Sequence, residues 1–438
     1  MFDTTFALYT VPMAAIMAAY LHSRSSEGVR STAALAEAVS SGLTEPASLH
    51  PVIDPSLCMG CGSCVTACPE GEILGIIDGV AELIEPTQCI GHGACKTACP
   101  FGAISLVFGT ETRGVDIPNV GPDFQTNVPG IYIAGELGGM GLIRNAIEQG
   151  RQALEMIANT GRKGGEGDYD VLIIGAGPAG FSASLAAMER GLKYLTVEQD
   201  SLGGTVSHFP RGKLVMTQPA TLPLVGKVNM RETTKEDLLS FWEGVMRTTG
   251  VKVSFQERVE AIVAVEGAGL RQGFDVTTTT GVYRARNILL AIGRRGTPRK
   301  LEVAGEDLPK VVYRLDDPAQ YRGKSVLVVG GGDSAIEAAT TIAEEPGTTV
   351  TLSYRGDAFT RLKGKNRARL ASFEQDGLLR VLPKSSVKKI LLNCIELKTE
   401  QGPLAMPNDA VIVCAGGILP MGFLKSMGVE METKHGST

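Results

Sequence analysis

Three features of this 438-residue sequence predict an α/β fold. Residues 168–191 and 324–344 each run from an apolar segment through a glycine-rich turn into an alanine-rich segment. This is the pattern of a buried parallel strand followed by a helix. Seven of the nine cysteines fall within residues 58–99, and an uncharged segment occupies residues 5–21. We therefore expect two parallel-sheet domains, a small α+β domain that holds metal, and an N-terminal apolar helix.

The composition is that of a folded protein and gives no electrostatic case for binding nucleic acid. Hydrophobic residues make up 43% of the chain and charged residues 20%, which are ordinary values, and the length allows two to four domains. The formal net charge of −5 and the aromatic content of 5% offer neither a basic surface nor many rings for stacking bases. Clustered cysteines indicate metal ligation, and hence a reducing compartment, rather than disulfides.

The apolar segment Thr5–Leu21 predicts a single membrane anchor. It carries no charged residue, and its length is at the lower limit of about 17 residues for a helix that spans a bilayer. Arg24 and Arg30 follow it, and basic residues there would keep the rest of the chain on the cytoplasmic side of the inner membrane. A surface or packed helix that happens to be apolar is the alternative, which Pro12 favours.

The cysteines repeat one spacing twice. CMGCGSCVTACP has the spacing C-x2-C-x2-C-x3-C-P, and CIGHGACKTACP repeats it from Cys89 onward with histidine at the second position. Three thiolates on one tight loop hold one face of an iron–sulfur cubane, and the fourth cysteine, expected to start a short helix, points toward a neighbouring cluster. ILGIIDGVAELIE, between the two runs, predicts two strands joined by an Asp-Gly turn. The candidate ligands are Cys58, Cys61, Cys64, Cys68, Cys89, His92, Cys95 and Cys99.

This block resembles the bacterial two-cluster ferredoxin over about residues 51–108. The resemblance implies two 4Fe–4S clusters with crossed ligation. At His92 three outcomes stay open: the imidazole ligates iron and alters the cluster's potential, it does not ligate and leaves a 3Fe–4S cluster, or another group fills the site. We favour ligation because imidazole suits iron. Zinc is disfavoured because it takes four ligands, whereas eight fall here in two matched sets. The first cluster would take Cys58, Cys61, Cys64 and Cys99, and the second Cys68, Cys89 and Cys95 with His92 available.

Residues 168–191 predict the first of two Rossmann-like dinucleotide sites. Glycines allow the tight turn after the strand, the approach of the pyrophosphate and the close packing of the helix, whose N-terminus faces the phosphates. Glu198 ends the next strand, where an acid hydrogen-bonds an unphosphorylated ribose such as that of FAD. The LGGT loop at residues 202–205 resembles the flavin-side loop of flavoproteins with this motif. The predicted FAD contacts are Gly175, Ala176, Gly177, Pro178, Ala179, Gly180, Glu198, Gly203, Gly204 and Thr205.

Residues 324–344 predict the second dinucleotide site, for a nicotinamide cofactor. The strand that follows, TVTLSYRGDAFTR, ends without an acid, and Arg355 stands where the ribose acid would be, with Arg361 close behind. Guanidinium groups there match a 2′-phosphate, so we expect NADPH in preference to NADH. Solvated basic residues on a loop are the alternative interpretation. The predicted contacts are Gly330, Gly331, Gly332, Asp333, Ser334, Ala335, Arg355 and Arg361.

With the strands ILLAIGRRGTPRKLEVAGED and AVIVCAGGILP, the paired motifs resemble the low-molecular-weight thioredoxin reductase superfamily over residues 168–438. Members that reduce thioredoxin carry a redox Cys-x-x-C, whereas here only Cys394 and Cys414 lie beyond residue 99, too far apart along the chain for that motif. We expect both to be packed thiols. The remaining relatives are ferredoxin–NADP reductases of this type and the bacillithiol-disulfide-reductase group, which GGTVSHFPRGKLVMTQPATLPL resembles more.

We interpret one element of the superfamily as displaced to the front of the chain. Relatives continue well beyond the NADPH domain and return to the flavin through a TS-x-PG-x-[FY]-x-AGD element, whereas this chain reaches Thr438 soon after the strand that begins at Ala410. Residues 126–136, TNVPGIYIAGE, supply the missing element and add Gly135 and Glu136 to the predicted FAD contacts. We therefore expect a circularly permuted flavoprotein fused behind the ferredoxin, with an unrelated strand–helix linker as the alternative.

These expectations combine into an NAD(P)H-dependent flavin/iron–sulfur oxidoreductase that exchanges electrons with an unknown redox protein or quinone-linked complex. The cofactors carry the chemistry, so no catalytic side chain is expected. The alternatives are an FAD-dependent reductase of small disulfides or persulfides, and a redox-sensing electron-transfer subunit; a homodimer stays open. The expected domains are an anchor (1–25), a linker (26–50), a ferredoxin domain (51–108), the permuted FAD-closing segment (109–160), an FAD domain (168–298), an NAD(P) domain (299–415) and a return to the FAD domain (416–438).

Overall fold

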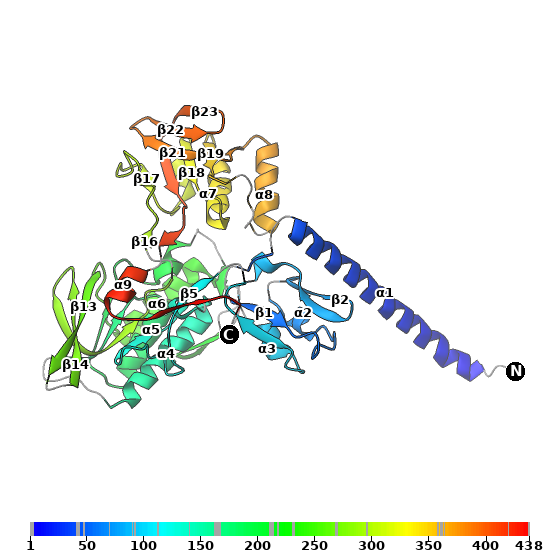
Figure 1. The fold of residues 1–438 in the computed structure, drawn as a ribbon, viewed down its shortest axis with the longest axis horizontal. Helices are drawn as coiled ribbons and strands as arrows, with labels where there is room; N and C mark the ends of the chain where they lie inside the picture. Colours follow the sequence, from blue (N-terminus) through cyan, green and yellow to red (C-terminus); the bar gives the residue numbers. More distant parts are fainter. Residues whose placement is uncertain are drawn as a thin grey trace. The chain divides into compact units, whose positions relative to one another are not determined.

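The contacts within the chain divide it into two compact units, one of residues 1–115 with 433–438 and one of residues 116–432. Figure 1 draws the fold of this computed structural model. The described residues are 4–40, 44–46, 49–69, 71–89, 91, 93–111, 114–139, 141–161, 168–209, 214–216, 219–229, 233–267, 270–294, 297–356, 359, 362, 364–418 and 420–436.

The first unit contains the long helix α1 (Thr4–Ser40), drawn as one continuous rod in Figure 1. The expected linker over residues 26–50 is wrong as far as Ser40, because STAALAEAVS at residues 31–40 is rich in strong helix formers. Pro12 lies inside the helix. Among the described helices, none combines the length and the apolar character needed to cross a membrane, so the anchor expected over residues 5–21 gains no support.

Two short antiparallel strand pairs and several short helices follow α1 in this unit. β1 (His50–Ile53) pairs with β4 (Ile104–Val107), and β2 (Leu74–Ile77) pairs with β3 (Val80–Leu83). Asp78 and Gly79 join the latter pair with φ of 49° and 82°, as a two-residue type I′ hairpin turn requires. The strand–turn–strand expected here is confirmed. The short helices of the unit are α2 (Ser63–Ala67), η1 (Pro86–Gln88) and α3 (Ala94–Ala98).

The two largest sheets of the second unit have six and five strands, and the six-stranded sheet carries the sequence expected to bind FAD. The strand β7 is apolar and its last four residues are buried, as expected for a parallel strand covered on both faces. The strand order is β13-β14-β15-β7-β8, and β6 pairs with β15 in parallel. These strands are β6 (Ile131–Ile133), β7 (Tyr169–Ile174), β8 (Tyr194–Val197), β13 (Val259–Gly267), β14 (Leu270–Thr278) and β15 (Val282–Leu290).

One long strand explains how β6 enters this sheet. The first half of β15 pairs antiparallel with β14 from Val282 to Ala285, and its last residues, Ile288–Leu290, pair in parallel with β6. From Ala285 onward its other edge pairs with β7. A strand from far earlier in the chain therefore completes the carboxyl end of the sheet. The helices α4 (Ile143–Asn159), α5 (Pro178–Glu189) and α6 (Lys235–Thr249) belong to this part of the unit.

The second sheet is wholly parallel, with the order β17-β24-β18-β19-β20. The helices α7 (Asp333–Ala343) and α8 (Gly364–Gln375) belong to it, and Ile336, Ile342 and Leu370 from them are buried in its core. The α/β class with two Rossmann-like domains is thus confirmed. The strands are β17 (Val311–Val312), β18 (Ser325–Val329), β19 (Thr349–Ser353), β20 (Leu379–Leu382) and β24 (Ala410–Val413).

The remaining elements are short. An antiparallel sheet of β21, β22 and β23 joins the second domain. Their bounds and those of the other elements are β5 (Val115–Pro118), η2 (Glu136–Gly138), η3 (Gly204–His208), β9 (Leu214–Met216), β10 (Ala220–Leu222), β11 (Gly226–Val228), β12 (Thr233–Thr234), β16 (Thr297–Pro298), η4 (Pro318–Tyr321), β21 (Ser386–Ile390), β22 (Cys394–Thr399), β23 (Gly402–Pro407), β25 (Gly417–Ile418), α9 (Met421–Ser426) and β26 (Met431–Lys434).

Candidate functional site

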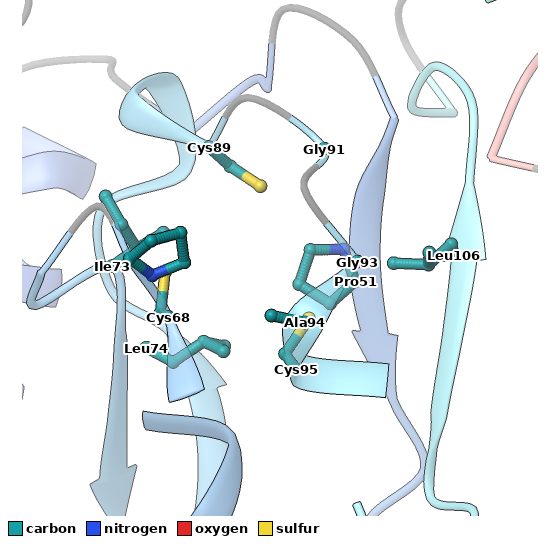
Figure 2. Close-up of a pocket in the computed structure, with 11 residues that line it drawn as sticks. Pro51, Cys68, Ile73, Leu74, Cys89, Gly91, Gly93, Ala94, Cys95 and Leu106 are labelled. Carbon is teal, nitrogen blue, oxygen red and sulfur yellow. The ribbon is translucent and has the colours of Figure 1, made fainter. Parts of the chain in front are cut away.

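The seven clustered cysteines fall into two separate groups in the structure. Each group lines a small cavity of its own. Figure 2 shows the thiols of the second group facing one space. The first cavity takes its fourth cysteine from the second sequence run, and the second takes one from the first run, as crossed ligation requires. The groups are Cys58, Cys61, Cys64 and Cys99, and Cys68, Cys89 and Cys95.

The proline after each run decides where the fourth cysteine points. Cys68 and Cys99 follow the helices α2 and α3 as C-caps, with ψ of 118° and 110°. The expectation that this cysteine starts a short helix is therefore wrong, because a residue before proline is pushed from helical into extended backbone. The helix ends there, and the extended residue carries its thiol to the other cavity. The third cysteines, Cys64 and Cys95, lie inside the helices and are buried.

The described candidate ligands line two cavities and do not gather around one point. Among the described residues, no three cysteine, histidine or acidic side chains lie close enough together to hold one ion. A cubane spreads its ligands over four irons, whereas zinc gathers four around one centre. Burial raises the pKa of Cys64 and of Cys95, and a bound cation would favour their thiolate forms. His92 lies outside the described residues.

The first glycine turn has the shape of a pyrophosphate cradle. A Cβ added at Gly180 would overlap the carbonyl oxygen of Gly175, and one added at Gly175 would lie 2.5 Å from that of Ala291. Only glycine fits these two positions, so the turn and α5 pack directly on the sheet. Gly177 is the N-cap of α5, with Pro178 and Ala179 as its first residues, and the helix N-terminus therefore faces the open side of the turn.

Glu198 closes the cradle from the end of β8. Its two carboxylate oxygens accept hydrogen bonds from the backbone N–H groups of Ala176, at 2.7 Å, and Asp200, at 2.9 Å. Burial raises the pKa of this carboxyl group, against the effect of those hydrogen bonds. A carboxylate has about four acceptor positions, so two remain for the hydroxyls of a ribose. The residue fits the expected contact with the adenosine half of FAD.

Three segments converge on the carboxyl end of this sheet. The Gly203 N–H donates to the Ala176 carbonyl at 3.0 Å, which brings the LGGT loop onto the first glycine turn. A Cβ added at Gly293, just after β15, would lie 3.9 Å from Thr205 Oγ1 and 4.0 Å from Glu136 Oε2. The structure therefore brings the predicted contacts Gly204, Thr205, Gly135 and Glu136 together with the glycine turn, at the end of the sheet where a flavin is expected.

An aromatic ring that the sequence did not reveal packs against the second glycine turn. Gly332 is the N-cap of α7, which begins with Asp333, Ser334 and Ala335. A Cβ added at Gly331 would overlap the ring of Tyr354. That ring also stacks on Phe359, with 5.0 Å between the centroids and 19° between the planes. Gly330 packs in the same way against the backbone that follows β24, because an added Cβ would overlap the Cys414 carbonyl.

Of the two arginines expected to bind phosphate, the structure describes Arg355. Arg355 directly follows Tyr354 and is exposed to solvent, whereas Arg361 lies outside the described residues. Asn366 of α8, which sequence reasoning missed, donates a 2.7 Å hydrogen bond to Asp333 Oδ1 and ties α8 to the turn. Cys414 Sγ donates to the Ser334 carbonyl at 3.8 Å, and burial raises its pKa to about 12. A thiol in that state is a poor nucleophile.

Comparison with known proteins decides the family. Residues 172–437 match the pyridine nucleotide-disulphide oxidoreductase family, which is more than half of the chain. The chain belongs to this family. Residues 50–100 of this oxidoreductase match the 4Fe-4S dicluster domain, in agreement with the two cysteine groups. The protein is thus a FAD/NAD(P)-dependent oxidoreductase with a ferredoxin-type iron–sulfur domain.

Relatives and solved structures place this oxidoreductase within the family. It is 30% identical to a ferredoxin–NADP reductase of Ignicoccus hospitalis over 269 residues, 61% of this chain and 83% of that protein. It is 25% identical to a bacilliredoxin reductase of Bacillus subtilis over 270 residues, 60% of this chain and 82% of that protein. The bacillithiol disulfide reductase of Bacillus cereus superposes with a TM-score of 0.52 at 25% identity, over 60% of this chain and 82% of that one.

Proposed function

We propose that this oxidoreductase passes electrons between NADPH, FAD and two ferredoxin-type clusters, to or from an external electron carrier. The carrier is a redox protein or a quinone-linked complex. The observation that supports this proposal most is the crossed sorting of seven cysteines into two cavities, in a chain that also has two dinucleotide cradles. A flavin can accept two electrons from NADPH and pass them on one at a time, and the two clusters are one-electron centres that suit this transfer.

The side chains of this protein hold and orient the cofactors. The turn that begins at Gly175 and the N-terminus of α5 receive the pyrophosphate of FAD, and Glu198 receives its ribose. Glu136 and Thr205 stand at the flavin end. FAD supplies the chemistry that accepts hydride and releases electrons one at a time. No side chain needs to act as an acid, base or nucleophile in this transfer.

NADPH is proposed over NADH because of the loop after β19. The two positions directly after the strand hold Tyr354 and the exposed Arg355, and neither is an acid. A guanidinium binds a 2′-phosphate, whereas an acid would repel it. Arg361 is proposed as the second contact from its place in the sequence.

We also propose that the flavoprotein is circularly permuted. Support comes from β6, which precedes β7 along the chain with the whole of α4 between them, and yet pairs with β15 in the FAD sheet. The Asn119 N–H donates to the Glu430 carbonyl at 2.9 Å, and Asn127 Nδ2 donates to the Gly428 carbonyl at 2.8 Å. The C-terminal segment thus ends beside the segment that would follow it in an unpermuted chain, as circular permutation requires.

An anaerobic reaction of the full-length protein with NADPH tests the proposed electron path. We expect the flavin absorbance to bleach first and the paramagnetic signals of reduced clusters to appear afterwards. A Cys61→Ser variant, altered in one ligand of the first cavity, should bleach normally and change the signal of one cluster. Flavin bleaching without any cluster signal would contradict the path.

A second candidate is FAD-dependent reduction of a small disulfide or persulfide, which the similarity to bacillithiol disulfide reductases favours. Cys414 would have to be the reactive thiol, and its raised pKa weighs against this role. Unchanged turnover in a Cys414→Ala variant would exclude it. A redox-sensing electron-transfer subunit, the third candidate, would leave its flavin oxidised when mixed with NADPH.

A further inference from the structure

A basic side chain of α1 reaches the loop that carries the ligands of the first cluster. Arg24 Nη2 donates a 2.6 Å hydrogen bond to the carbonyl of Gly60. Gly60 stands between Cys58 and Cys61, which both line the first cavity. The two partners are 36 residues apart in the sequence, so the fold brings them together. The sequence pattern suggested that Arg24 is the basic flank of a membrane anchor, whereas in the structure it has a partner in the ferredoxin-type domain.

Small residues on one face of α1 fix the place of this arginine. A Cβ added at Gly75 of β2 would overlap the Ser31 side chain, and one added at Gly28 would lie 3.8 Å from the Ile76 carbonyl. Ser31 is buried. Positions 24, 28 and 31 share one face of a helix because they are spaced by four and three residues. The face that packs on the β2–β3 hairpin therefore also presents Arg24 to the loop.

We propose that Arg24 is a positioning residue of the first cluster whose positive charge raises the reduction potential of that cluster. Reduction adds one electron, delivered from NADPH by way of FAD, to a centre held by four thiolates. A nearby guanidinium favours this more negative form over the oxidised form. Arg24 is exposed, so solvent screens the interaction and the shift is modest. The inference rests on the proposed function, because it requires both clusters to be present.

Redox titrations of the full-length protein, followed by electron paramagnetic resonance, test the effect of the charge. Arg24→Gln should lower the reduction potential of one cluster by at most about 59 mV. For a one-electron step this shift corresponds to a tenfold smaller equilibrium constant for reduction. The other potential should stay unchanged. Arg24→Lys, which keeps the charge, should behave as wild type. The cluster that moves should be the one whose signal changes in Cys61→Ser.

Arg30→Gln is the matched control on the same helix. In the wild-type protein the Arg30 guanidinium lies 4.0 Å from the carboxylate of Glu72, and the two side chains are largely exposed, at 64% and 81%. We expect neither cluster to respond to it. Two unchanged potentials in Arg24→Gln, or an equal fall in Arg24→Lys, would overturn the role of the charge. A wild-type protein without cluster signals would instead contradict the proposed function.

A histidine at position 24 keeps the inference testable if Arg24→Gln does not assemble its first cluster. An exposed histidine loses its charge as the pH rises through about 6.5. In Arg24→His the potential of the first cluster should then fall, between about pH 5.5 and 8, by more than it does in wild type. An identical pH dependence of the two proteins would overturn the inference.

Discussion

Arg355 is the residue on which we expect the choice of coenzyme to depend. Replacing it with alanine should raise the Michaelis constant for NADPH by about one to two decades, because a charged hydrogen bond contributes about 1.5–3 kcal/mol. The constant for NADH should barely change, since NADH lacks the 2′-phosphate. Steady-state kinetics with both coenzymes measure the difference.

Arg322 provides the control for this prediction. It precedes β18, at the opposite end of that strand from the glycine turn, and forms a 2.6 Å ion pair with Glu345. Arg322→Ala should leave both Michaelis constants as they are. Equal losses with NADPH and NADH in Arg355→Ala would refute the assignment, because they would point to a general fault in the site.

His92 is the one departure from an otherwise regular ligand pattern. Glycines stand on both sides of it, so the loop can adapt to a longer side chain. A neutral imidazole in place of a thiolate removes one negative charge from the cluster and favours its reduced form, as histidine ligation does in Rieske centres. His92→Cys should therefore lower the potential of one cluster and leave the other nearly unchanged in a redox titration. A 3Fe–4S signal in wild type, or unchanged potentials in His92→Ala, would show that His92 is not a ligand.

At the scale of residues, the sequence predicted those whose type is dictated by backbone geometry. Gly175 and Gly180 could be predicted because the cradle admits no side chain there. Tyr354 could not be predicted, because nothing local says that an aromatic residue after a strand folds back over Gly331. Asn366 was missed for a similar reason, since its partner Asp333 is 33 residues away.

Two helical glycines test how the elements of the FAD domain are packed. In α4, a Cβ added at Gly150 would overlap the carbonyl oxygen of Ala179 at the start of α5. In α6, a Cβ added at Gly244 would meet only the end of the Arg247 side chain, at 3.9 Å. Gly150→Ala should therefore lower the free energy of unfolding by about 1–3 kcal/mol, and thermal or denaturant unfolding measures this loss.

Gly244→Ala is the matched control, because alanine is the better helix former. It should leave the stability unchanged or raise it by up to about 1 kcal/mol. Similar losses of unfolding free energy in both variants would contradict the role of close helix packing at Gly150. Because Ala179 belongs to the FAD cradle, we also expect Gly150→Ala to retain less FAD after purification.

At the scale of elements, local patterns predicted strands and turns better than helix ends. The turn at Asp78 and Gly79 followed from two residues that tolerate positive φ. The end of α1 was missed because its alanine-rich second half has no apolar periodicity strong enough to distinguish a packed helix from a linker. The direction of Cys68 and Cys99 depends on the prolines that follow them, a signal that was present in the sequence and was misread.

At the scale of the molecule, the order of segments along the chain differs from their order in space. The proposed circular permutation accounts for this order, and the sequence suggested it through TNVPGIYIAGE at residues 126–136, an element that the superfamily resemblance places after the NADPH domain. The hydrogen bonds of Asn127 to Gly428, at 2.8 Å, and from Glu430, at 2.9 Å, join the two segments inside one unit. The proposed permutation therefore predicts that a short linker between residues 432 and 116 restores the unpermuted order without moving the sheet.

That restored chain is the test of permutation. Residues 168–432, a short glycine-rich linker and residues 116–161 contain every strand of the FAD sheet, so this chain should fold without the ferredoxin-type domain and bind FAD. Residues 168–432 alone lack β6 and α4, and the edge of β15 and the cradle around Ala179 would stay uncovered. We expect this shorter chain to lose FAD or to aggregate. Flavin content after gel filtration separates the two chains, and equal FAD retention by both would show that residues 116–161 are only a linker.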